Sequence, residues 1–184
     1  MKLTEQDILH LIAQDPWMMD VLRLVRDLHL PDCWVGAGFV RNKVWDQLHG
    51  YNAATALDDV DVVYYDIDYP EESFETEMEE KLQENRSEIK WSVTNQARMH
   101  AVHGDRPYKD TGEAMAKWPE TCTAVAVRMK EDGSVELLAP WGIEDLVNMV
   151  VRPTPAFEHK MDEFTARQEK KQWIKKWPKI QFGG

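Results

Sequence analysis

The stretch that decides the fold runs Leu57-Asp58-Asp59-Val60-Asp61-Val62-Val63-Tyr64-Tyr65-Asp66. Its β-branched and aromatic residues predict a buried strand. Side chains two residues apart share one face of a strand, so Asp59 and Asp61 should point the same way, about 6.6 Å apart along the chain. Two carboxylates on one face repel each other, and a bound Mg²⁺ ion relieves this because it prefers hard oxygen ligands. The pattern indicates a metal site or, equally, a strand end whose acids reach solvent.

A second informative stretch lies upstream and runs Trp34-Val35-Gly36-Ala37-Gly38-Phe39-Val40-Arg41-Asn42. It predicts a short strand, a tight turn of small residues and then a helix. Backbone N–H groups at a helix N-terminus and the helix dipole together form an anion site. Arg41, one turn into the helix, is placed to reach the same anion. Taken alone, the turn is more simply explained by a steric need for glycine.

The rest of the pattern predicts a single domain over residues 1–184, with a core of about residues 30–153. Two helices are expected within residues 4–28, because Thr4 begins a capping box and an Asp-Pro pair follows later in the segment. One long C-terminal helix is expected over about residues 157–177. The ends of the chain should therefore be helical and the sheet should lie between them.

Strands and helices alternate through the middle of the chain. An acidic helix is expected from Glu71, a strand from Ile89, an irregular polar segment over residues 96–110 and a helix over residues 142–150. The Asp-Gly pair within residues 131–134 is a strong β-hairpin signal. This order predicts an α+β (α/β) fold with a small mixed sheet flanked by helices.

The charge distribution excludes some functions. The chain has 184 residues and a net charge of −11, which argues against general DNA binding and against docking on anionic membranes. Residues 58–80 contain eleven acids and no Lys or Arg, so this segment carries the whole excess of negative charge. There is no apolar signal region or membrane-length run, and we expect a cytoplasmic protein.

Together, the glycine turn and the following Asp-x-Asp strand resemble the core signature of the DNA polymerase β-like nucleotidyltransferase superfamily. Further stretches resemble an uncharacterised bacterial nucleotidyltransferase family within it: Asn95-Gln96-Ala97-Arg98-Met99-His100, Pro107-Tyr108, Trp118-Pro119-Glu120-Thr121 and Ala139-Pro140-Trp141-Gly142-Ile143-Glu144-Asp145-Leu146. The resemblance spans roughly residues 34–153. It implies the nucleotidyltransferase (polymerase β-like) fold.

The resemblance also implies a site and a reaction. The turn Gly36-Ala37-Gly38 would hold the triphosphate of an NTP, and Asp59 and Asp61 would hold Mg²⁺ (or Mn²⁺). The ions would polarise the α-phosphate and neutralise the leaving pyrophosphate. A nucleoside monophosphate would then pass to an acceptor hydroxyl or phosphate on a small molecule, a protein or an RNA. Arg41, Asn95, Arg98 and His100 are candidate nucleotide contacts, and Arg98 is equally explained by pairing with a nearby acid.

Active members of the superfamily carry a third carboxylate on a neighbouring strand, and this sequence departs from that pattern. The expected strand ends at Asn95, which can ligate a metal through its carbonyl oxygen but cannot take a proton. Glu136 is the favoured substitute as a catalytic acid, and Asp58 is the other. The alternative function is a catalytically silent nucleotide-binding or interaction module, antitoxin-like or regulatory, on the same fold.

Overall fold

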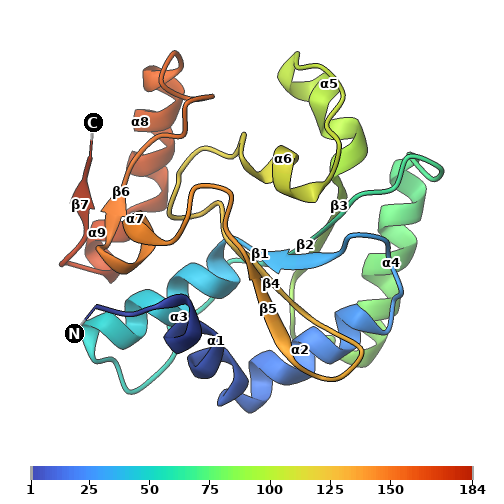
Figure 1. Ribbon diagram of the computed structural model, residues 1–184, viewed down its shortest axis with the longest axis horizontal. Coiled ribbons are helices and arrows are strands. Elements are labelled where there is room, and N and C mark those ends of the chain that lie inside the picture. Colours follow the sequence, from blue (N-terminus) through green and yellow to red (C-terminus); the bar gives the residue numbers. More distant parts are fainter. Residues whose placement is uncertain (1, 184) are drawn as a thin grey trace.

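The N-terminal segment is helical, as expected. A computed structural model describes residues 2–183 (Figure 1). Helices α1 (Glu5–Ala13) and α2 (Pro16–Arg26) begin at the predicted caps, where the side chains of Thr4 and Asp15 accept hydrogen bonds from backbone N–H groups. Such caps satisfy donors that a helix cannot pair internally, typically stabilising it by ~1 kcal/mol.

The centre of the molecule is a five-stranded mixed sheet with the strand order β3-β2-β1-β4-β5. Its strands are β1 (Trp34–Gly36), β2 (Val60–Tyr64), β3 (Trp91–Asn95), β4 (Ala126–Met129) and β5 (Val135–Leu138). Only β2 and β3 pair in parallel, and the other three pairings are antiparallel. The predicted small mixed sheet and the predicted hairpin between β4 and β5 are therefore confirmed.

One face of the sheet packs against helices α1 to α4. In Figure 1, α1 and α2 lie below the sheet, α3 extends to its left and α4 stands to its right. Helix α3 (Gly38–His49) packs against the central strands, and α4 (Glu72–Asn85) packs against the edge strand β3. Val60 and Val62 of β2 point into this layer and are 2% and 0% exposed. Because side chains alternate along a strand, Asp61 points to the opposite face. The burial of Val60 and Val62 on one face of β2 thus determines the direction of the Asp61 carboxylate.

The opposite face is covered by the segment between β3 and β4. It contains η1 (Gln96–Arg98), α5 (Met99–His103) and α6 (Thr111–Met115), which lie above the sheet in Figure 1. The expectation of an irregular segment over residues 96–110 is wrong for its first half, which is helical. Met115 packs with Trp34 and Val63 in a small apolar cluster on this face.

The C-terminal segment is not one long helix, and this expectation is wrong. The segment comprises α7 (Glu144–Val147), β6 (Val150–Val151), α8 (Met161–Lys171), α9 (Trp173–Lys176) and β7 (Gln181–Phe182). Gln172 has a positive φ of 47°, which ends α8 and turns the chain into α9. The turn places Trp173 in the core, where it is 3% exposed. The helix expected over residues 142–150 is likewise reduced to α7.

Tryptophan packing fastens the C-terminal helices to α3. The ring of Trp45 on α3 is fully buried and meets Trp173 and Trp177 edge-on, with ring centroids 5.7 and 5.2 Å apart. Trp177 also donates its indole N–H to Asp46 at 2.7 Å. Edge-to-face pairs of this kind stabilise a fold by ~0.5–1.5 kcal/mol beyond the effect of burying their surface. Within residues 2–183, no helix is both long and apolar enough to cross a bilayer.

Candidate active site

Close packing explains the first glycine of the turn between β1 and α3. A Cβ atom at Gly36 would lie 3.1 Å from the ring of Trp118 and 3.2 Å from the carbonyl oxygen of Val125. Ala37 follows with φ 53° and ψ −121°, a conformation that a side chain disfavours. Its N–H donates to Val125 at 2.9 Å, which holds the strained turn in place. Strain of this kind gathers at functional sites.

We expect Ala37→Gly to stabilise the protein by ~1 kcal/mol, because glycine adopts a positive φ without a steric penalty. Urea unfolding measures the change. Ala53→Gly is a suitable control, since Ala53 is exposed and its φ is not positive. That control should lower stability by ~0.5 kcal/mol through the added freedom of the unfolded chain. Equal losses in the two variants would contradict strain at Ala37.

The sheet register brings the carboxylate pair to the glycine turn. Asp61 of β2 lies directly opposite Gly36 of β1, and Asp59 comes just before β2 begins. Both side chains line a small cleft of about 50 Å³ with the turn residues Ala37 and Gly38. The two stretches that the sequence singled out therefore meet in space.

Burial and mutual repulsion act on the two carboxylates. Burial, and then the charge of Asp59, raise the pKa of Asp61 to about 6. A divalent cation between the carboxylates would remove this penalty. Among residues 2–183 no three His, Cys, Asp or Glu side chains form a metal-binding group. Mg²⁺ fits a two-carboxylate site, because it commonly binds one or two carboxylates together with substrate phosphates and water.

Arg41 lies behind the turn and lines the same cleft. Its guanidinium donates to Thr123 at 3.0 Å and to Asn42 at 2.9 Å, and it stacks 4.1 Å from the ring centroid of Trp173. Burial lowers the pKa of Arg41, although the group remains a cation. Its Nε is buried and has no hydrogen-bond partner in the described structure. Arg41 therefore places a fixed positive charge close to the N-terminus of α3.

Three more cations reach the cleft from α8 and α9, and the sequence did not indicate them. Arg167 pairs with the fully buried Glu120 at 2.6 Å. Lys171 and Lys176 both pair with Asp58, at 3.3 and 3.9 Å. Burial acts to raise the pKa of Asp58, but the hydrogen bond from Lys171 and the two lysine charges hold it below its ordinary value. No local pattern could reveal these contacts, because the paired residues lie 47 or more positions apart in the chain.

Two of the expected site residues lie away from the carboxylate pair. Asn95 is buried at the far end of β3, and its amide bonds the backbone of Asp66 and Tyr69. Glu136 lies on β5, three strands from β2, which is roughly 14 Å across the sheet. It forms an ion pair with Arg128 on β4. Neither residue lines the cleft.

Arg98 and His100 also lie outside the cleft. Arg98 hydrogen-bonds the buried carboxylate of Glu75 at 2.7 and 3.0 Å and also pairs with Glu72, so it joins the acidic helix α4 to η1. The Nδ1 atom of His100 contacts the carbonyl oxygen of Ala97 at 2.8 Å. Both side chains have structural partners where the sequence suggested nucleotide contacts.

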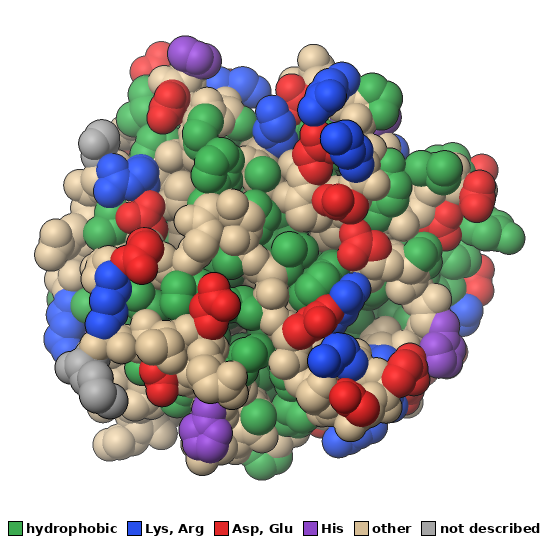
Figure 2. Space-filling view, in the orientation of Figure 1, with side chains coloured by type: hydrophobic (Ala, Val, Ile, Leu, Met, Phe, Trp, Pro, Cys, Tyr) green, Lys and Arg blue, Asp and Glu red, His purple; other side chains and the backbone are tan. Residues whose placement is uncertain are grey.

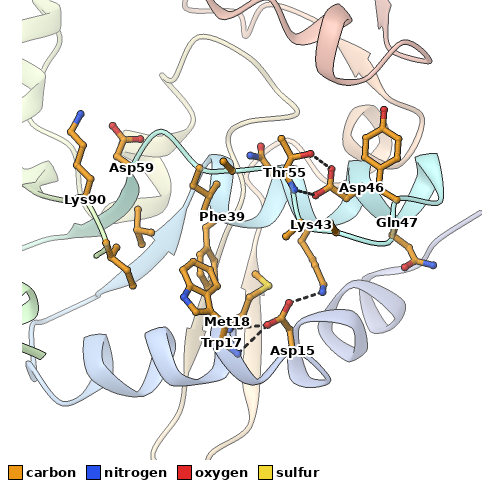
Figure 3. A pocket seen from close by; sticks show the side chains of 18 of the residues that line it. Asp15, Trp17, Met18, Phe39, Lys43, Asp46, Gln47, Thr55, Asp59 and Lys90 are labelled. Atoms are coloured by element: carbon orange, nitrogen blue, oxygen red, sulfur yellow. Dashed lines mark hydrogen bonds and ion pairs between the residues drawn. The ribbon is translucent and has the colours of Figure 1, made fainter. Parts of the chain in front are cut away.

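A larger groove of about 490 Å³ opens beside Asp59 (Figure 3). Its floor holds Phe39 and the half-exposed ring of Trp17, whose centroids are 5.9 Å apart. In Figure 3, Lys90 lies next to Asp59 at one end of the groove, and Gln47 lies at the other. The loop residue Tyr51 also lines the groove. Asp59 is common to the groove and the smaller cleft, so the two cavities meet at a carboxylate.

A glycine turn set against an Asp-x-Asp strand on a mixed sheet defines the class of nucleotidyltransferase-like proteins. Residues 23–182 match the model of a family described as nucleotidyltransferase, and the chain belongs to this family. No curated protein matches the sequence.

Solved structures agree with this assignment. One, an NMR structure described as revealing a CCA-adding enzyme head domain, is 37% identical with a TM-score of 0.86, over 98% of this chain and 96% of that chain. The Thermotoga maritima CCA-adding enzyme complexed with tRNA is 16% identical with a TM-score of 0.60, over 99% of this chain and 43% of that chain. A CCA-adding enzyme complexed with CTP is 14% identical with a TM-score of 0.61, over 99% and 44%. The polymerase β-like fold is thereby confirmed, and this chain spans less than half of the two enzymes.

Proposed function

We propose that this protein is a Mg²⁺-dependent (or Mn²⁺-dependent) nucleotidyltransferase that moves a nucleoside monophosphate from an NTP to an acceptor hydroxyl or phosphate. The observation that carries the proposal is the register that sets Asp61 opposite Gly36, so that the anion site of the turn faces the carboxylate pair. Asp59 and Asp61 would hold the metal. When bound, the metal neutralises phosphate charge and lowers the pKa of an attacking hydroxyl.

The chain's own residues bind and orient the reactants. Backbone N–H groups at the start of α3 receive the phosphates, and Arg41 adds a positive charge that cannot move away, because Trp173 and Thr123 hold it. The acceptor oxygen then bonds to the α-phosphorus as the bond to pyrophosphate breaks, and a hydroxyl acceptor gives up its proton to solvent water. Fixed charges need no reorganisation during this step, which is the main catalytic contribution available to such a site.

The groove beside Asp59 is the acceptor site in this proposal. Its volume of about 490 Å³ falls within the range of small-molecule pockets, and its exposed Trp17 offers an apolar surface. Acidic and basic side chains are interspersed on the face shown in Figure 2, which displays no continuous basic band. A small or protein acceptor suits the groove better than a long nucleic acid, because the chain carries a net charge of −11 and nucleic acids bind through a basic footprint.

One observation favours the alternative, a nucleotide-binding module without turnover. The residue beside Asp61 on the neighbouring strand β3 is Ser92, which offers a hydroxyl where active superfamily members place a carboxylate. Without that group the acceptor would lack a base. The alternative predicts tight binding of NTP and Mg²⁺ with no product.

Pyrophosphate release distinguishes the two functions. Each of the four NTPs is incubated with Mg²⁺ or Mn²⁺, with and without a cell extract that supplies acceptors. We expect release with at least one NTP, stimulated by the extract, and transfer of an α-phosphate label to a product. The product's class, whether small molecule, protein or RNA, identifies the acceptor. NTP binding by calorimetry without release would establish the silent module, and neither binding nor release would contradict both.

A further inference from the structure

We propose that Lys171 and Lys176 form a clamp for the triphosphate chain of the nucleotide. Asp58 holds the two lysines in position until the phosphates replace it. The inference rests on the proposed nucleotide site and extends it, because it gives the C-terminal helices α8 and α9 a direct part in binding the substrate. Without them, the turn and Arg41 alone would face the phosphates.

The position of the two ammonium groups is the first support. Lys171 and Lys176 line the cleft that also contains Gly38, Asp59 and Asp61. The cleft gathers four cationic side chains and three carboxylates, although the chain as a whole carries a net charge of −11. A concentration of cations beside a carboxylate pair is the arrangement that a metal–polyphosphate complex needs, since it carries both kinds of charge.

The other two cations of the cleft are already committed to the fold. Arg167 donates at 2.6 Å to Glu120, whose side chain is fully buried, and losing this partner would leave an uncompensated buried charge. Arg41 is itself buried and lies against Trp173. Only the two lysines have a partner that they can exchange at low cost.

That partner, Asp58, is a weak one. Its side chain is 60% exposed, and one carboxylate serves both ammonium groups at 3.3 and 3.9 Å. Exposed ion pairs of this kind contribute little to stability. A triphosphate offers several negative oxygens to the same two groups, and charge-assisted contacts in a confined cleft are stronger. Phosphate oxygens should therefore replace Asp58 once the nucleotide binds.

The backbone prepares the clamp in advance. The positive φ of Gln172 separates α8 from α9, so that Lys171 ends one helix and Lys176 ends the other. Trp173 and Trp177, next to them in the chain, are buried and anchor both helices. Little freedom of the main chain remains to be lost when the ligand arrives, which favours affinity.

Metal-free tripolyphosphate tests the clamp without relying on turnover. Its affinity is measured by calorimetry at low ionic strength for the wild-type chain and for three variants. We expect Lys171→Gln/Lys176→Gln to weaken binding at least ~10-fold and Asp58→Asn to tighten it ~3-fold or more. Lys170→Gln/Lys175→Gln removes the same charge from the same two helices at exposed positions outside the cleft, and should change affinity less than ~2-fold.

Three results would overturn the clamp: no tripolyphosphate binding by the wild type, equal effects of the two lysine pairs, or weaker binding after Asp58→Asn. The thermal unfolding of every variant is also measured, so that weaker binding can be distinguished from an unfolded protein. The outcome is independent of turnover. If tripolyphosphate binds through the lysines but no pyrophosphate is released from NTP, only the proposed enzyme activity is contradicted. If the protein turns over NTP but the lysine variants bind tripolyphosphate as tightly as the wild type, only the clamp is contradicted.

Discussion

Asp61→Asn is expected to abolish nucleotidyl transfer and, at the same time, to stabilise the metal-free protein. The variant keeps the size of the side chain and removes the charge that binds the metal. If the metal supplies several kcal/mol of transition-state stabilisation, the rate should fall at least ~1,000-fold. Pyrophosphate release at saturating NTP and Mg²⁺ measures this loss, and Asp59→Asn should behave similarly.

The gain in stability follows from the raised pKa of Asp61. Burial and the neighbouring Asp59 raise this pKa from 3.8 to about 6, so the ionised carboxylate opposes folding. The shift sets an upper limit of ~3 kcal/mol on the gain, and partial exposure reduces our expectation to ~1–2 kcal/mol. The carboxylate opposes folding only when ionised. The gain should therefore be absent below about pH 4, grow between pH 4 and 6, and be complete at pH 7.

Glu136→Gln is the matched control, because it makes the same change of acid to amide on the same sheet. Its position on β5, paired with Arg128, predicts nearly unchanged turnover and no gain in stability. Loss of turnover in this control would instead make Glu136 the third carboxylate. A destabilised Asp61→Asn protein at pH 7 would show that the carboxylate pair is not under electrostatic strain.

The sequence predicted those parts of the fold that local chemistry determines. Thr4 and Asp15 cap their helices, the Asp-Gly pair turns the hairpin, and the alternation of Val60 and Val62 buries one face of β2. The glycine turn and the Asp-x-Asp strand were also readable, because each is a short pattern with its own physical cause. Their meeting at one cleft followed from the resemblance.

The contacts that complete the cleft were not predictable, because they join distant parts of the chain. Lys171 meets Asp58 only after α8 has packed against the fold, and no periodicity marks the break at Gln172. The parallel register pairs Asp61 with Ser92, which lies three residues before Asn95 on β3. Because side chains alternate along a strand, the side chain of Asn95 lies on the face opposite Asp61. A register between strands depends on tertiary packing, which a single sequence does not state.

Trp177→Ala is expected to cost ~3–5 kcal/mol of unfolding free energy, one of the largest losses available in this chain. The side chain is fully buried, contacts Trp45 edge-on, and donates its indole N–H to Asp46. Its removal leaves a cavity and takes one donor from a buried carboxylate, and each effect is costly. Urea unfolding followed by circular dichroism, which does not depend on the lost fluorophore, measures the change.

Trp141→Ala is the control, since Trp141 is 43% exposed and should cost ~1 kcal/mol or less. Trp177→Phe keeps an aromatic ring and loses the N–H, so its cost should lie between the two. Because Trp177 anchors the helices that carry Lys171 and Lys176, Trp177→Ala should also weaken tripolyphosphate binding at temperatures where it stays folded. Equal losses of stability in the two alanine variants would show that the tryptophan cluster does not hold the C-terminal helices to α3.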